Sequence, residues 1–191
     1  MTQPGFTAIQ DSPDRSRRRL AGTIGIVLAA PALILSRHAP ASLAPPRTLR
    51  FDHTHTGEKL AIAYTAGDRY LPAALQEISR FLRDFRTGEV HAIDPKLLDQ
   101  LHQLATVTRS STPFEVISGY RSAATNTILR SHSTGVASQS LHLEGRAIDT
   151  RLANVSIAEL RDAAISLRAG GVGFYPDSKF VHVDTGRIRR W

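Results

Sequence analysis

The sequence predicts an α+β fold in one domain, in which N-terminal helices come first and pack against a small antiparallel sheet that follows. Apolar residues recur at helical spacing from residue 71 to residue 104, and short β-prone runs separated by turn residues occupy residues 146–184. The chain has 191 residues, of which 41% are hydrophobic, so one core can form without covalent cross-links. It contains no cysteine, which excludes disulfides, thiolate metal ligands and a lipid anchor on an N-terminal cysteine.

The first half of the domain is predicted to form a hairpin and two helices. Residues 48–64 alternate between apolar and polar types around Gly57, which is typical of a hairpin. Residues 71–86 place their apolar side chains at helical spacing. Asp94 and Pro95 are typical of a helix N-cap and first helical position, and the leucines after them predict a second helix.

The second half is predicted to alternate short strands and helices. Ser156 and Glu159 have capping-box spacing and therefore mark a helix start. We expect, in order, a strand at 114–117, a helix at 122–130, a loop at 131–140, a strand at 146–152, the helix opening at Ser156, and a closing hairpin at 172–184.

The first 41 residues have the composition of an export signal. Arg17, Arg18 and Arg19 precede an uncharged, mostly apolar run over residues 20–35, and small residues at 39–41 suit a signal peptidase. The Ser-Arg-Arg-x-Leu order resembles a twin-arginine signal. The apolar run is shorter than the about 20 residues that a membrane-spanning helix needs, so cleavage is favoured over the alternative, a retained anchor. We therefore expect a signal peptide at 1–41, a linker at 42–47, a domain at 48–191 and a periplasmic protein.

The charge balance limits the kind of partner. The formal net charge is +7, and part of it belongs to the arginines of the expected signal. The rest of the chain has no basic run with aromatic residues beside it, so nucleic-acid binding is not expected. A mild positive excess favours an acidic partner such as a cell-wall polymer. We expect a monomer with no membrane span after processing.

Strand alternation places candidate metal ligands on shared faces. In the predicted strand 180–184, His182 and Asp184 lie opposite two valines that face the core. Asp149 lies on one face of the preceding strand, and His142 lies at the start of that strand. Three ligands of His or carboxylate type with a fourth position for water are typical of hydrolytic zinc sites. The alternative is that these are structural hydrogen-bonding residues.

The sequences around these residues resemble a known family. Residues 140–149, Ser-Leu-His-Leu-Glu-Gly-Arg-Ala-Ile-Asp, resemble the Ser-x-His-x-x-Gly-x-Ala-x-Asp motif of the M15-type zinc peptidases, which include D-Ala-D-Ala carboxypeptidases and murein endopeptidases. Residues 118–122 match the Ser-Gly-Tyr-Arg-Ser segment of that group. Residues 171–175 and 180–187, closed by Trp191, are similar to its DUF882 branch. The resemblance extends from about residue 49 to residue 191.

The resemblance implies a fold, a metal and an activity. The fold would be of the hedgehog/D-Ala-D-Ala peptidase type, with Zn²⁺ held by His142, Asp149 and His182. Arg121 would face the substrate, where a guanidinium can donate to a carbonyl oxygen or to a stem-peptide carboxylate; the alternative is an ordinary salt bridge. We expect Ser140 to support a ligand by a hydrogen bond. The implied reaction is hydrolysis of peptide cross-links in peptidoglycan.

The general base is the least certain residue to assign, because the sequence departs from the family pattern. Some members place a glutamate three residues before the last histidine ligand, where this chain has Lys179. Others have a second histidine two residues from that ligand, where this chain has Asp184. We assign Asp184 as the residue that takes the proton of the attacking water. Glu144 and Asp177 stay as alternatives.

Three further alternatives stay open from the sequence. The chain could be a D,D- or L,D-carboxypeptidase that trims stem peptides, or a non-catalytic, zinc-stabilised wall-binding module. Histidine and aspartate ligands also suit several divalent ions other than zinc. His53 and His55 form a His-x-His pair that we expect on a solvated hairpin rather than at a metal.

Overall fold

The computed structural model describes residues 44–132 and 137–191. The predicted signal peptide at 1–41, the start of the linker and part of the loop predicted at 131–140 lie outside the described residues. Among the described residues, no helix is both long enough and apolar enough to cross a membrane.

Within the described residues, strands from both halves of the chain join in one seven-stranded mixed sheet, in the order β2-β1-β5-β6-β8-β7-β9. Its strands are β1 Thr48–His53, β2 Lys59–Ala63, β5 Phe114–Ser118, β6 Ala147–Leu152, β7 Gly171–Tyr175, β8 Phe180–Asp184 and β9 Arg189–Arg190. Neighbouring strands are antiparallel except for the parallel pairs β1–β5 and β7–β9. A second, two-stranded sheet pairs β3 Thr65–Ala66 with β4 Arg69–Tyr70.

The mixture of helices and strands is confirmed, but the prediction of a small, purely antiparallel sheet was wrong. The predicted N-terminal hairpin, β1 and β2, extends the sheet because β1 pairs in parallel with β5, with Phe51 opposite Phe114. Parallel neighbours need a long crossover, and here helices α1 Pro72–Phe81 and α2 Pro95–Val107 provide it. Local alternation identifies a strand but not its distant partner, so the sequence pattern did not reveal this pairing.

The helix starts follow the predicted capping signals. The Asp94 side chain caps α2 by accepting a hydrogen bond from the backbone of Lys96. Ser156 and Glu159 form the predicted capping box of α4 Ile157–Leu167. The remaining helices are α3 Ala123–His132 and the short 3₁₀ helix η1 Leu141–Glu144.

Helix α1 ends at Phe81, earlier than the predicted limit of residue 86. Beyond it, the buried carboxylate of Asp84 accepts hydrogen bonds from the backbone of Arg86 and from both the backbone and the hydroxyl of Ser122. These bonds turn the chain away from the helix axis. They also fix the start of α3 next to the turn over residues 118–122, which contributes to the candidate site described below.

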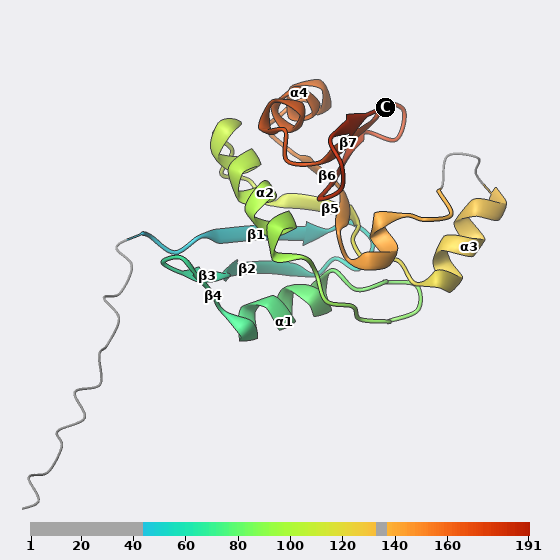
Figure 1. The fold of residues 1–191 in the computed structure, drawn as a ribbon, viewed down its shortest axis with the longest axis horizontal. Coiled ribbons are helices and arrows are strands. Elements are labelled where there is room, and N and C mark those ends of the chain that lie inside the picture. Colours follow the sequence, from blue (N-terminus) through green and yellow to red (C-terminus); the bar gives the residue numbers. More distant parts are fainter. Residues whose placement is uncertain (1–43, 133–136) are drawn as a thin grey trace, which may run out of the picture. The chain divides into compact units, whose positions relative to one another are not determined.

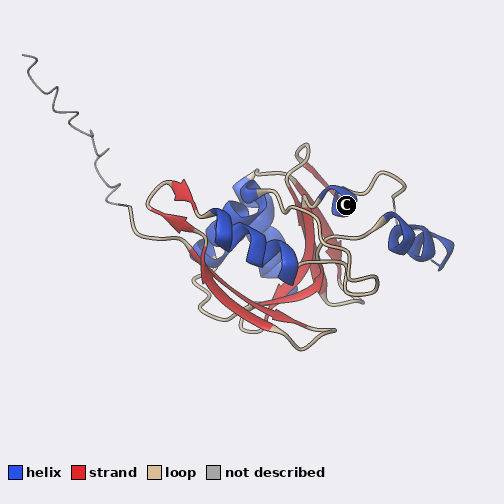
Figure 2. Ribbon diagram, turned by 90° about the horizontal axis from the view of Figure 1, so that it is seen from below, coloured by secondary structure: helices blue, strands red, loops and turns tan. Residues whose placement is uncertain are grey.

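The core lies between the sheet and the helices α1, α2 and α4, which contact it. Figure 2 shows helices lying inside the curve of the sheet, whereas α3 stands apart from it at the right of Figure 1. The side chains of α2 that the spacing predicted to be buried are all fully enclosed: Leu97, Leu98, Leu101 and Leu104. Each such leucine stabilises the fold by about 1.5–3 kcal/mol through burial. This packed layer holds β6 and β8 in fixed positions for the site.

Candidate metal centre

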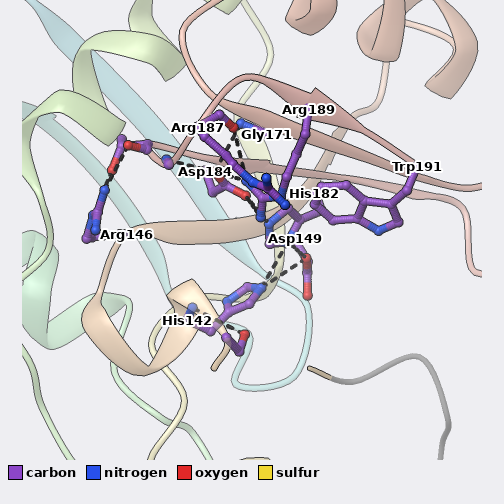
Figure 3. Close-up of polar contacts among 12 residues, drawn as sticks. His142, Arg146, Asp149, Gly171, His182, Asp184, Arg187, Arg189 and Trp191 are labelled. Atoms are coloured by element: carbon purple, nitrogen blue, oxygen red, sulfur yellow. Dashed lines mark hydrogen bonds and ion pairs between the residues drawn. The ribbon is translucent and has the colours of Figure 1, made fainter. Parts of the chain in front are cut away.

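Three side chains from separate segments converge beside strands β6 and β8. Asp149 on β6 lies directly opposite His182 on β8 in the antiparallel register. His142 belongs to η1, which Gly145 terminates in a left-handed conformation with φ of 64° just before β6. Figure 3 shows the three side chains pointing toward one another. The three residues that the sequence analysis named as ligands therefore lie together, and they form a group that could hold a metal ion.

The distances between the three side chains suit a tetrahedral metal ion. His142 Nε2 lies 3.2 Å from Asp149 Oδ1 and 3.2 Å from His182 Nδ1. His182 Nδ1 lies 2.9 Å from Asp149 Oδ1. Ligands placed tetrahedrally at zinc's usual bond lengths are about 3.3 Å apart. Small outward shifts of these atoms would therefore accommodate the ion.

Hydrogen bonds on the far side of each imidazole fix which nitrogen faces the centre. His142 Nδ1 donates to the carbonyl oxygen of Gly119 at 2.6 Å. His182 Nε2 donates to Asp184 Oδ2 at 3.0 Å. The other ring nitrogens, Nε2 of His142 and Nδ1 of His182, are thereby directed at Asp149. This outer layer of hydrogen bonds is characteristic of histidines that ligate metals.

The protonation states of His142 and Asp149 favour cation binding, whereas a metal would have to displace a proton from His182. Burial would lower the pKa of His182, but its hydrogen bonds to Asp149 and Asp184 outweigh burial and raise the pKa. Burial lowers the pKa of His142 and so favours its neutral ring. Burial alone would raise the pKa of Asp149, but the neighbouring His142 and His182 outweigh it and keep the pKa below its usual value. A neutral imidazole and an ionised carboxylate are the forms that bind a metal.

Asp184 is fully buried behind His182, with hydrogen bonds to both carboxylate oxygens. Oδ1 accepts from the backbone of Gly171 and Gly186, at 3.0 Å and 2.8 Å. The Arg189 guanidinium contacts both oxygens, at 3.1 Å and 2.8 Å. Burial would raise the pKa of Asp184, but the bonds from His182 and Arg189 outweigh it and hold the pKa below its usual range. Asp184 is therefore an ionised partner of His182 that does not line the cleft.

The backbone at Gly171, the first residue of β7, leaves no room for a side chain. A Cβ atom there would lie 2.5 Å from Asp184 Oδ2 and 2.3 Å from the Arg189 guanidinium. Any larger residue would therefore push apart the ion pair that supports His182.

Arg121 and Ser140 flank the three candidate ligands. Arg121 Nη2 donates to the second oxygen of Asp149 at 3.0 Å, and its Nε donates to Ser118 Oγ at 3.2 Å. Ser140 Oγ accepts from the backbone nitrogen of His142 at 3.4 Å and caps η1. Ser140 thus supports the segment that carries His142 through the backbone of that residue.

A cleft of about 570 Å³ opens over the candidate ligands. Its aromatic lining comes from Tyr175, Phe180 and Trp191. The Trp191 ring lies 5.2 Å from the His182 ring, and its Nε1 donates to the Tyr175 hydroxyl at 2.9 Å. The indole packs against Gly173, where a Cβ atom would come within 2.8 Å of the ring. Glycine at this position therefore makes room for Trp191. The spacing of the glycines and aromatics in 171–191 was the only sequence signal for this wall.

The two alternative bases lie away from the cleft. Glu144 pairs with Arg146 at 2.9 Å, and neither Glu144 nor Asp177 lines the cleft. His55 does line it, on the β1–β2 hairpin. His53 is only 2% exposed, so its expected position on a solvated surface was wrong. Its ring packs edge-on against Phe81 and belongs to the core.

Comparisons with known proteins identify the family of the chain. The family described as "Peptidoglycan L,D-endopeptidase MepK" (Peptidase_M15_2) matches residues 41–191. The Peptidoglycan L,D-endopeptidase MepK of Escherichia coli strain K12 is 41% identical over 181 residues, which cover 95% of this chain and 100% of that protein. The Probable peptidoglycan L,D-endopeptidase MepK of Haemophilus influenzae is 41% identical over 179 residues, covering 93% and 96% of the two chains. No solved structure matches the chain. The chain therefore belongs to the Peptidase_M15_2 family of M15-type peptidases.

Proposed function

We propose that this protein is a zinc-dependent murein endopeptidase that hydrolyses peptide cross-links in peptidoglycan. The observation that carries the proposal is the convergence of His142, Asp149 and His182, each with a ligand atom directed at one point below an open cleft. The relatives that share 41% of the sequence are named L,D-endopeptidases, and we propose the same class of bond for this chain. A fold of the hedgehog/D-Ala-D-Ala peptidase type is part of the proposal.

In this proposal the three residues hold one Zn²⁺, and surrounding groups fix their orientation. A bound zinc ion supplies Lewis-acid chemistry, because it polarises a carbonyl and lowers the pKa of water. The Gly119 carbonyl and the Asp184 carboxylate prevent the two imidazoles from rotating. Arg121 keeps Asp149 in place and lies in the cleft lining, where it can donate to a substrate oxygen that gains negative charge.

The geometry favours an orienting role for Asp184 over the direct proton transfer that the sequence led us to assign. Both of its oxygens are occupied, its side chain has no exposed area, and His182 lies between it and the cleft. A general base must come within hydrogen-bond distance of the proton that it takes. We therefore propose that Asp184 acts on the reaction through His182.

The expected site of action is the periplasm. The proposal assigns residues 1–41 as a twin-arginine-type signal peptide and residues 42–47 as a linker, on the sequence features alone. Export places the enzyme beside its proposed substrate, because peptidoglycan lies outside the inner membrane. We propose that it acts there as a monomer.

The test is incubation of the zinc-loaded protein with purified cross-linked muropeptide dimers, followed by mass spectrometry of the products. The proposal predicts release of monomers by the wild type, loss of release in His182→Ala, and full release in the matched control His132→Ala, whose side chain is exposed. Loss of single terminal residues without monomers would identify a carboxypeptidase. Binding of dimers without any product would identify a wall-binding module.

A further inference from the structure

Three arginines line the cleft, and two of them are already neutralised by carboxylates of the candidate metal centre. Arg121 pairs with Asp149 at 3.0 Å, and Arg189 pairs with Asp184 at 2.8 Å. Their charges therefore serve the protein's own acidic groups. The third arginine is Arg86, which differs from the other two in the groups that surround its guanidinium.

Arg86 has no acidic partner among the residues that the structure describes. Its side chain is exposed, and its guanidinium carbon lies 4.2 Å from the centre of the Phe85 ring. The His55 ring stacks on the same phenylalanine at 4.2 Å with an interplanar angle of 11°. A guanidinium held on an aromatic face keeps its N–H groups available for a ligand, and it loses less rotational freedom when the ligand binds.

The backbone of Arg86 is fixed by the protein interior. Its N–H donates to the buried carboxylate of Asp84 at 2.9 Å, and the same carboxylate binds the backbone and hydroxyl of Ser122. Ser122 follows Arg121 directly in the sequence. Asp84 therefore ties the segments of Arg86 and Arg121 together and holds both cations at the same cleft.

Arg83, three residues before Arg86, provides a comparison because a carboxylate neutralises its charge. It pairs with Glu58 through both terminal nitrogens, at 3.0 Å and 3.2 Å, and it does not line the cleft. Arg86 has no such acidic partner among the described residues and does line the cleft, so its charge stays available to a ligand.

We propose that Arg86, held on the Phe85 ring at the cleft lining, is a specificity-determining residue that binds a free carboxylate of the peptide substrate. This inference rests on the proposed endopeptidase function. The guanidinium offers the planar pair of N–H groups that matches a carboxylate, and no carboxylate of the described residues occupies it. The enzyme would therefore discriminate between cross-linked peptides with free carboxylates and those in which the carboxylates are amidated.

The test compares the zinc-loaded wild type with Arg86→Gln and with the matched control Arg83→Gln. Each protein is given two cross-linked peptides that differ only in having their side-chain carboxylates free or amidated. The wild type and Arg83→Gln should prefer the free acid, and Arg86→Gln should lose about tenfold in kcat/KM on the free acid, mainly through KM, with little change on the amide. Calorimetric binding of an uncross-linked stem peptide in its acid and amide forms should show the same loss of preference.

Two results would overturn the inference. Either Arg86→Gln retains the preference for the free acid, or it loses affinity equally for acid and amide. The calorimetric arm separates this inference from the proposed function. If the wild type cleaves neither cross-linked peptide, the proposed endopeptidase function is wrong. A loss of acid preference by Arg86→Gln in the calorimetric binding would still support Arg86 as the carboxylate-binding residue.

Discussion

Asp184→Asn tests how the metal centre is assembled, because the substitution keeps the side-chain shape and changes only one atom that accepts hydrogen bonds. Oδ1 accepts from Gly171, Gly186 and Arg189, whereas Oδ2 accepts from Arg189 and His182. An asparagine can keep its carbonyl oxygen toward the two backbone donors. Its NH₂ group then faces Arg189 and His182, both of which are donors.

The expected cost follows from these contacts. Each buried donor left without an acceptor costs about 1–3 kcal/mol. Because the Arg189 side chain is 31% exposed and can turn to water, we expect a loss of about 3 kcal/mol in the free energy of unfolding. His182 can avoid the clash only by moving its proton to Nδ1, the nitrogen that should ligate zinc. Loss of such an outer partner typically lowers metal affinity about 10- to 100-fold.

Urea unfolding and zinc competition against a chelating dye measure the two effects. Asp177→Asn is the matched control, since Asp177 is exposed and lies outside the cleft lining. It should behave as the wild type does. If Asp184→Asn kept wild-type zinc affinity while cleavage fell more than about a hundredfold, Asp184 would act on the proton directly and the orienting role would be refuted.

Two further predictions concern Gly173, which packs against Trp191, and the buried carboxylate of Asp84. Gly173→Ala places a methyl group where the Trp191 ring lies, at 2.8 Å, so the indole should leave His182 and the emission spectrum of the chain's single tryptophan should shift; an unchanged spectrum would contradict this packing. Burial raises the pKa of Asp84, but its hydrogen bonds from Ser122 and Arg86 outweigh burial and lower the pKa to about 2. The ionised carboxylate therefore adds about 2 kcal/mol of stability that is complete above its unfolded pKa, near pH 4, and is lost as the pH falls toward 2. Asp84→Asn should remove this part of the pH dependence in urea unfolding, and parallel profiles for the two proteins would count against it.

Local features of the fold were predictable because their signals lie within a few residues. The caps at Asp94 and Ser156 act on backbone groups two or three residues away, and both appear as predicted. The closing hairpin is likewise defined by alternation and a turn, and it forms β7 and β8. Alternation also correctly placed His182 on the face opposite the core.

Features that depend on distant partners were not predictable in this way. The parallel pairing of β1 with β5 joins residues more than 60 positions apart, such as Phe51 and Phe114, and no local pattern specifies it. Helix α1 ends early because Asp84 bonds to Ser122, 38 residues away. A histidine in an exposed-looking hairpin, His53, is buried because Phe81 and Phe85 of another segment cover it.

The site itself shows the same division. The motif over residues 140–149 and the strand alternation identified the three candidate ligands, which lie together in the structure. The sequence did not show the surroundings of Asp184, because they depend on Gly171 of β7 and Arg189 of β9 approaching it. A carboxylate next to a ligand looks the same in sequence whether it faces the substrate or the interior.

The central claim is that His142, Asp149 and His182 hold one catalytic zinc ion. Elemental analysis of protein purified without added metal, paired with cleavage of cross-linked muropeptides, tests it most directly. The account predicts about one zinc per chain in the wild type and in His132→Ala, and less than about a tenth of that in His182→Ala. Cleavage should disappear on chelation and return with zinc. A folded wild type that cleaves its substrate without bound metal, or a His182→Ala variant with full zinc content, would contradict the claim.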